Sequence, residues 1–232
     1  MHSEIERNLE ENRVDSLVSL SKGIVGVLPF AGPLFSEVIG AVIPNQRADR
    51  IVGFLHELDK RLRLLEAVAS LNKYSVDLFE DTLQQASRAL SDDRNRTLAN
   101  YFSKSINVDE DEYETKKKIL QVLAELTDVD LEILDKIHRQ GYQSTARNYY
   151  PGNLTQGQYD WLDDDEKYQY KLEQVSFDTH IFTLERNRLI EAERQEQDED
   201  NTHRHIDPET GLPNILSYKV SKFGEVLLYS IR

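Results

Sequence analysis

The chain has 232 residues, enough for one large domain or two small ones. Its 42 acidic residues outnumber its 28 basic residues and give a formal net charge of −14, which argues against general electrostatic binding to nucleic acid or anionic lipid. The absence of cysteine excludes disulfides, thiol nucleophiles and cysteine-based metal sites, and it fits a reducing compartment.

The first 43 residues contain the most apolar part of the chain. Residues 1–22 mix aliphatic with charged side chains and predict a polar amphipathic helix, and they lack the basic region and cleavage site of a secretory signal. Residues 23–43 carry one formal charge, Glu37. As a straight helix this stretch would extend roughly 30 Å, about the thickness of a bilayer core.

Prolines and glycines interrupt this apolar segment. Pro29 and Pro33 each remove a helical hydrogen bond, and Gly32 followed by Pro33 is typical of a turn. We therefore expect two short apolar helices, 23–30 and 33–43, folded as a hairpin. Three interpretations of the hairpin stay open: it is buried in the core of a helical bundle, it inserts into a membrane, or it binds a partner.

A series of amphipathic helices is expected to follow. Residues 46–71 and 76–90 carry apolar side chains at three- and four-residue spacing, with charged residues between them. Ser91 is placed to cap a further helix. The acidic residues 109–112 have no calcium-loop glycine and indicate a solvated helix start, which leads into another amphipathic helix.

Thr127 and Asp130 resemble a capping box, in which the threonine hydroxyl accepts a hydrogen bond from the third amide of the next helix. That helix is expected to run to about Gln140 and to stop at Gly141. Beyond it the composition changes, because tyrosines and the one tryptophan concentrate in 141–172.

The last third of the chain is expected to turn from helix to strand. We predict helices over 155–173 and 176–187. Residues 188–193 and 215–220 then have the character of two strands, joined by a polar loop over 194–214. Ser221 is placed to cap a closing helix over 222–231.

This ending resembles a winged-helix domain. In that family a helix ends in a leucine-rich junction, two strands form the wing, and the second strand leads through Y-x-[VL]-[ST]-x-x-G into a last helix. The segments LERNRLIEAE and LSYKVSKFGEVLLYSI have this order. The residues at matching positions are Leu184, Leu189, Ile190, Tyr218, Val220, Ser221, Gly224, Leu227 and Leu228. The resemblance covers 127–232 and makes the helix at 128–140 the first helix of the domain.

The layout of the whole chain is similar to bacterial abortive-infection (phage-defence) proteins of the alpha type. These combine an apolar Gly/Pro segment, amphipathic helices and a winged-helix-like end. The matching pieces are GIVGVLPFAGPLFSEVIGAVIPNQR, FEDTLQQASRALSDDR and ILQVLAELTDVDLEILDKI. The resemblance implies a role in antiviral defence.

A winged helix suggests DNA binding first, which needs lysine and arginine on the helix that enters the groove and on the wing. Residues 127–232 instead hold 12 basic and 21 acidic residues, a net charge of −9. Phosphates would be repelled, so we do not expect a nucleic-acid partner. A DNA-binding alternative would rely on a local patch of Arg186, Arg188 and Arg204.

Two groups of residues are candidates for an interaction surface. The first belongs to the apolar hairpin and would contact either a partner or a membrane: Leu28, Phe30, Leu34 and Phe35. The second is aromatic, of the kind enriched at protein interfaces: Tyr149, Tyr150, Tyr159 and Trp161. The aromatic group would serve equally well as packing between the two halves of the chain.

Signatures of catalysis and of cofactor binding are missing. The sequence has no phosphate-binding P-loop, no G-x-G-x-x-G, no H-E-x-x-H and no G-x-S-x-G. Imidazoles and carboxylates over 198–207 have metal-ligand chemistry, but their segment has the composition of a solvated loop. We therefore predict that the chain is not an enzyme and binds no cofactor and no metal.

The predicted fold is mainly α: a helical bundle with an apolar Gly/Pro helical hairpin, followed by a winged-helix-like region with a two-stranded β wing. The expected division is 1–126, with the hairpin at 23–43, and 127–232. The predicted function is a non-enzymatic bacterial protein-interaction or regulatory protein in phage defence, with a protein partner or self-association. The alternatives are a membrane-active effector that inserts 23–43 and a DNA-binding regulator. We expect a cytoplasmic location, with peripheral attachment to the inner membrane as an alternative.

Overall fold

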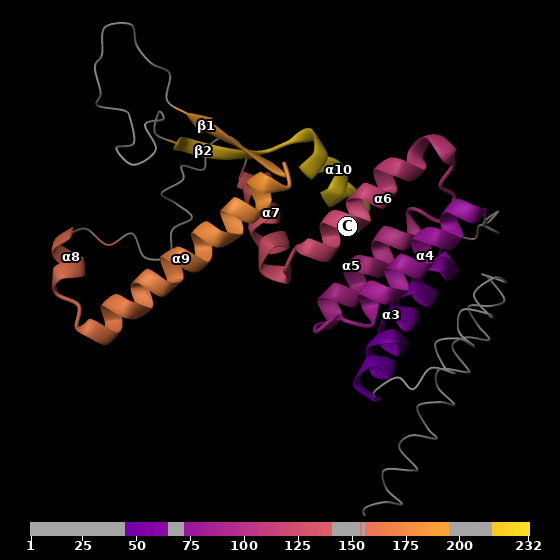
Figure 1. Ribbon diagram of the computed structural model, residues 1–232, viewed down its shortest axis with the longest axis horizontal. Helices are drawn as coiled ribbons and strands as arrows, with labels where there is room; N and C mark the ends of the chain where they lie inside the picture. The colour runs from indigo at the N-terminus through magenta and orange to yellow at the C-terminus, as the bar shows by residue number, and fades with distance from the viewer. Residues whose placement is uncertain (1–44, 65–71, 141–153, 155, 195–214) are drawn as a thin grey trace, which may run out of the picture. The chain divides into compact units, whose positions relative to one another are not determined.

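A computed structural model describes residues 45–64, 72–140, 154, 156–194 and 215–232. The described chain is mainly helical, with eight helices and one pair of antiparallel strands that precedes the last helix (Figure 1). It divides into two compact units. Unit 1 comprises Met1–Glu125 and Tyr229–Arg232, and unit 2 comprises Leu126–Leu228.

Unit 1 is built from four described helices, α3 (Asn45–Leu64), α4 (Lys73–Ala86), α5 (Asp92–Ser103) and α6 (Glu110–Glu125). Helix α5 packs against α3 and α4, and α6 packs against α4. Each helix buries its apolar stripe, as its three- and four-residue spacing predicts. The largest fully buried side chains are Phe54, Leu55, Leu58, Leu78, Phe79, Leu98, Tyr101, Phe102 and Ile119.

Side-chain caps set the starts of the unit 1 helices. Asn72 accepts from the amides of Tyr74 and Ser75 at the start of α4. Ser91 accepts from the amide of Arg94 at 3.0 Å, which confirms the predicted cap of α5. Helix α4 ends at Ala86, however, so the predicted helix over 76–90 is too long. Leu90, expected on its apolar face, is 88% exposed.

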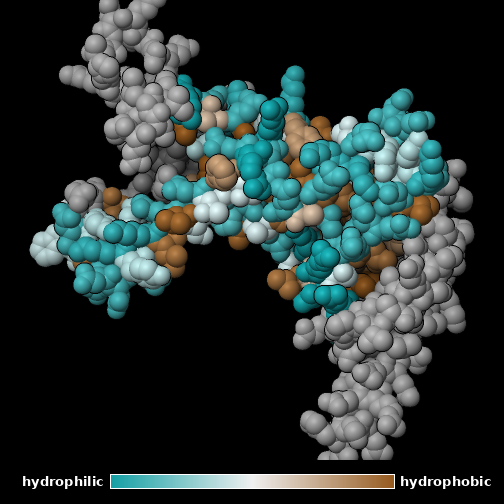
Figure 2. Space-filling model, viewed as in Figure 1, coloured by the Kyte–Doolittle hydropathy of each residue, from teal (hydrophilic) through white to brown (hydrophobic). Residues whose placement is uncertain are grey.

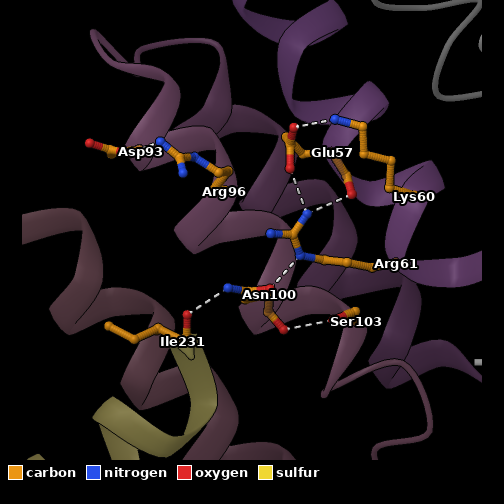
Figure 3. A network of polar contacts seen from close by, with 8 residues as sticks. All are labelled: Glu57, Lys60, Arg61, Asp93, Arg96, Asn100, Ser103 and Ile231. Atoms are coloured by element: carbon orange, nitrogen blue, oxygen red, sulfur yellow. Dashed lines mark hydrogen bonds and ion pairs between the residues drawn. The ribbon is translucent and has the colours of Figure 1, made fainter. Parts of the chain in front are cut away.

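A polar network joins α3, α5 and the last residues of unit 1 (Figure 3). Arg61 donates from Nη1 to Oε2 of Glu57 at 2.8 Å and from Nε to Oδ1 of Asn100. Asn100 in turn donates from Nδ2 to the carbonyl of Ile231 at 2.9 Å. Hydrogen bonds from Arg61 and Lys60 hold the pKa of Glu57 below its ordinary value.

Helices α4 and α6 are also joined by an ion-pair cluster. Lys117 lies 2.5 Å from Oδ2 of Asp77 and 2.8 Å from Oδ2 of Asp81. Partial burial would raise the pKa of Asp77, but hydrogen bonds from Lys117 and Tyr113 together outweigh it and lower that pKa. These hydrogen bonds therefore favour the ionised form of Asp77 at the contact between α4 and α6.

Unit 2 contains α7 (Asp128–Gln140), α8 (Gln156–Asp160), α9 (Asp164–Arg186), β1 (Ile190–Arg194) and β2 (Ile215–Val220), and α10 (Lys222–Ile231) begins in it. Helix α9 packs against α7 and β1, and α7 packs against β2. The strands pair antiparallel, with Ile190 opposite Val220 and Ala192 opposite Tyr218. Burial raises the pKa of Tyr218 to about 12, which agrees with its place in the core of this unit.

The strand and cap predictions for unit 2 are largely confirmed. Thr127 Oγ1 accepts from the amide of Asp130 at 3.2 Å, and Asp130 Oδ2 accepts from the amide of Thr127 at 2.6 Å. Ser221 Oγ accepts from the amide of Gly224 at 3.0 Å at the start of α10. Strand β2 has the predicted bounds, and β1 lies close to its predicted position.

The prediction of two helices, over 155–173 and 176–187, places the break between them wrongly. Helix α9 is continuous for 23 residues, and the described residues of 155–163 hold the separate five-residue helix α8. Asp163 is the N-cap of α9 and forms a reciprocal capping box with Glu166. The acidic run at 163–166 is therefore a helix start. There, carboxylates accept hydrogen bonds from free backbone amides and interact favourably with the positive end of the helix dipole.

The predicted helix over 1–22 and the apolar hairpin over 23–43 lie outside the described residues. So does the predicted loop over 194–214, except for Arg194, which is the last residue of β1.

Candidate interaction surface

Helix α9 carries a row of exposed apolar side chains along the side that faces away from unit 2's core. Tyr168 is 63% exposed, Leu172 49%, Val175 62% and Phe182 63%. With Thr179 they recur at spacings of four, three, four and three residues. This spacing places them on one side of a helix. We call these five residues the α9 stripe.

The opposite side of α9 packs inside unit 2. Ile181 and Leu184 are its two buried side chains, and both belong to the last two turns. At 100° per residue these positions point away from the α9 stripe. Helix α9 therefore has apolar residues on two sides, and unit 2 covers one of them within the described part of the chain. Figure 2 shows hydrophobic residues among the hydrophilic ones over α9.

A buried carboxylate ties α9 to α7. Asp130 is 3% exposed at its side chain, and its Oδ1 lies 2.8 Å from Nδ1 of His180. Its Oδ2 accepts from both the amide and the hydroxyl of Thr127. Because a carboxylate only accepts, His180 is assigned as the donor through Nδ1–H. This anchor orients the second half of α9 and therefore the direction in which the α9 stripe points.

The N-terminal end of α9 adds aromatic residues. Trp161, in the turn after α8, is 91% exposed. Tyr159 is half-buried, because its ring lies 5.7 Å from that of Tyr170 and the Lys167 ammonium lies 5.9 Å from its centroid. Of the two described members of the predicted aromatic group, Trp161 is thus open to a partner and Tyr159 packs locally.

The remaining predicted surface residues lie outside the described residues: Leu28, Phe30, Leu34, Phe35, Tyr149, Tyr150 and Arg204. The predictions that concern them stay predictions. Among the described residues, no helix combines the length and apolar character needed to span a membrane. In the same part of the chain, histidines and carboxylates form no group of three that could hold a metal ion.

The two described arginines of the predicted DNA patch lie where α9 gives way to β1. Arg186 is exposed in the last turn of α9, and Arg188 is exposed with a φ of 55°. The amide of Leu189 donates to the carbonyl of Leu184 at 2.9 Å, which makes this a Schellman-type helix end with Arg188 at the left-handed position. Arg188 therefore has a backbone role that is independent of any ligand.

Replacing Arg188 with glycine is expected to stabilise unit 2 by about 0.5–1 kcal/mol, because glycine adopts positive φ without steric cost. Hydrogen exchange of α9 and β1 amides should slow in the variant. Arg186→Gly is the matched control, since it places glycine inside the helix, and it should lower stability by about 1 kcal/mol. Faster exchange in Arg188→Gly than in the wild type would contradict the backbone role.

Sequence reasoning missed the α9 stripe because a helix break was expected at 174–175, which separates Tyr168 and Leu172 from Thr179 and Phe182. The signal available in the sequence was the unbroken four-three spacing from Tyr168 to Phe182, together with the capping box at Asp163.

Comparison of the chain with protein-family models, curated proteins and solved structures gives no match.

Proposed function

We propose that this chain is a non-enzymatic protein-interaction or regulatory protein whose contact surface is the α9 stripe. The observation that carries the proposal is the exposure of four large apolar side chains on one side of a single helix. Tyr168 and Phe182 alone leave on the order of 250 Å² of aromatic side chain in solvent. Apolar patches of a few hundred Å² on soluble proteins mark contact surfaces.

The finer fold assignment is part of this proposal. A helix, two antiparallel strands and a last helix follow one another from α9 to α10, and we infer that 127–232 is a winged-helix-like region used for protein contact. Its net charge of −9 supports protein over nucleic acid as the partner. A role in bacterial phage defence is the process that the similarity in layout implies, and it rests on that similarity alone.

The test compares three forms of the full chain in affinity capture and in sedimentation. The double variant Leu172→Lys, Val175→Lys puts two charges on the α9 stripe, where desolvating them would abolish apolar contact. We expect it to lose association that the wild type shows. Leu90→Lys is the control, because it puts the same charge on an exposed apolar residue of unit 1, outside the α9 stripe, and should leave association intact.

Circular dichroism of the double variant should match the wild type, since both positions are exposed. A wild type that associates with nothing, including itself, would contradict the proposal. Association that survives unchanged in the double variant would place the contact surface elsewhere.

A further inference from the structure

Helix α10 begins in unit 2 and ends in unit 1, and we propose that its last turn closes unit 1 only while unit 2 holds the start of the helix. Residues 222–228 belong to unit 2 and residues 229–231 to unit 1, and the helix is continuous between them. The hydrogen bonds that fasten each end lie within a single unit. The inference concerns α10 and does not depend on the α9 stripe.

Unit 2 fastens the start of α10. Ser221 Oγ accepts from the amide of Gly224 at 3.0 Å. The amide of Ser221 donates to the carbonyl of Leu189, at the start of the strand pair, at 2.9 Å. Leu227 and Leu228, which follow on the helix, are buried. The part of α10 in unit 2 is therefore held both by a cap and by apolar burial.

Unit 1 fastens the end of α10 through two donors at the C-terminal end of α5. The last four carbonyls of a helix have no hydrogen-bond partner within it. Nδ2 of Asn100 donates to the carbonyl of Ile231 at 2.9 Å, and Nζ of Lys104 donates to the carbonyl of Tyr229 at 2.6 Å. The Lys104 ammonium also lies at the negative end of the helix dipole, where a cation is favourable. We call these two hydrogen bonds the latch.

The latch is connected to α3 through the same asparagine. Oδ1 of Asn100 accepts from Nε of Arg61, so its Nδ2 is the group that donates to Ile231. Arg61 is held in turn by Glu57, within α3 (Figure 3). Release of α10 would remove one side of this network. The backbone amides of α3 and α5 should therefore report whether the latch is closed.

Helix α10 is too short to be stable by itself. Isolated helices of fewer than about 12–15 residues are marginal in water, and α10 has 10 residues. The carbonyls of Tyr229 and Ile231 are placed as acceptors only while the helix is formed, so loosening its start weakens the latch. By linkage, the latch stabilises the start by the same factor. A ligand that fastens or loosens the start of α10 would thus control the closure of unit 1.

Hydrogen exchange of the full-length chain tests the dependence of unit 1 on unit 2. Ser221→Ala removes the cap in unit 2 and should speed exchange of α3 and α5 amides in unit 1 about fivefold. Ser217→Ala is the matched control, because it removes a serine hydrogen bond to Glu193 in unit 2 but leaves the start of α10 intact. Unchanged exchange in unit 1 for Ser221→Ala, or equal acceleration by both variants, would overturn the proposal.

The reverse dependence is tested from unit 1. Lys104→Met keeps the aliphatic stem but removes one bond of the latch, and it should speed exchange of the Gly224 and Glu225 amides in unit 2 about threefold. Lys118→Met, at an exposed lysine of α6, should leave these amides unchanged. Because Lys104 is exposed, this variant decides the question even where Ser221→Ala unfolds unit 2. Wild-type exchange of both amides in Lys104→Met would overturn the proposal.

A combined variant shows whether the latch carries the effect. In a full-length chain with Asn100→Leu and Lys104→Met, adding Ser221→Ala should change exchange in unit 1 by less than about twofold, because the latch is already lost. Acceleration by the full factor in that background would reveal another route and overturn the proposal. The α9 stripe is unaltered in all these variants, so the association test decides the proposed function separately.

Discussion

Replacing Gly224 with alanine is expected to destabilise unit 2 by about 2–3 kcal/mol, since overpacking against backbone leaves no side chain free to yield. A Cβ at this position would lie 2.2 Å from the carbonyl oxygen of Leu189 and 2.7 Å from Cγ1 of Val220. The Leu189 carbonyl accepts from the amide of Ser221 at 2.9 Å, so it cannot move without loosening the junction of β1 with α10. The better helix propensity of alanine offsets only about 1 kcal/mol of this loss.

Gly157→Ala is the matched control for this substitution. Gly157 is also helical, but a Cβ there meets no atom within 4 Å. The control should lose no stability and gain up to about 1 kcal/mol. Hydrogen exchange of β1 and α10 amides gives the readout, because it isolates opening of this junction from the rest of the chain. Equal exchange in Gly224→Ala and the wild type would show that the close approach is not needed.

Replacing Asp130 with alanine is expected to lower the stability of unit 2 by about 2–4 kcal/mol, because hydrogen bonds to charged groups are strong and their donors would lose their partner. The carboxylate accepts from the amide and hydroxyl of Thr127 and from Nδ1 of His180. Its loss removes the carboxylate half of the capping box of α7 and the tie between α7 and α9 in one step. Exchange should therefore accelerate in both helices.

Two comparisons isolate the contribution of the tie. Glu132→Ala, on the same helix, removes an exposed ion pair with Lys136 and should cost at most about 0.5 kcal/mol. A double-mutant cycle of Asp130→Ala with His180→Ala should give a coupling of about 1–2 kcal/mol. Additive effects in that cycle would show that Asp130 acts only as a cap of α7.

Local signals in the sequence predicted the helix starts well. Each predicted cap accepts from the amide three residues after it, so its geometry involves only neighbouring residues. These caps are Ser91, Thr127 and Ser221. The strand pair was also predictable from local sequence. Its residues do not follow the three- and four-residue spacing of a helix, and a polar segment with turn residues separates the two strands.

The exposed side of α9 was not predictable by the same means. Residues 173–176 contain no glycine or proline, so nothing local ends the helix there, and the predicted break is absent from α9. Which side becomes core depends on contacts with the neighbouring β1 and with α7, and the contacts with α7 join residues distant in sequence. The α9 stripe follows from that choice, so exposure of Tyr168 and Val175 could not be inferred from their own neighbourhood. Leu90 failed as a core prediction because α4 ends four residues before it.

The assignment of Tyr229–Arg232 to unit 1 has a consequence for the order in which the protein is made. Helices α3 to α6 are complete at Glu125, yet Asn100 binds the carbonyl of Ile231, 131 residues further along the chain. At translation rates of about 5–20 residues per second, a ribosome needs on the order of 5–20 s to reach these closing residues. Throughout that interval the nascent unit 1 lacks its last partner, while the ribosome synthesises the whole of unit 2. A chain released before that point would contain the helices α3 to α9 but would lack the contact of Asn100 with Ile231 that completes unit 1.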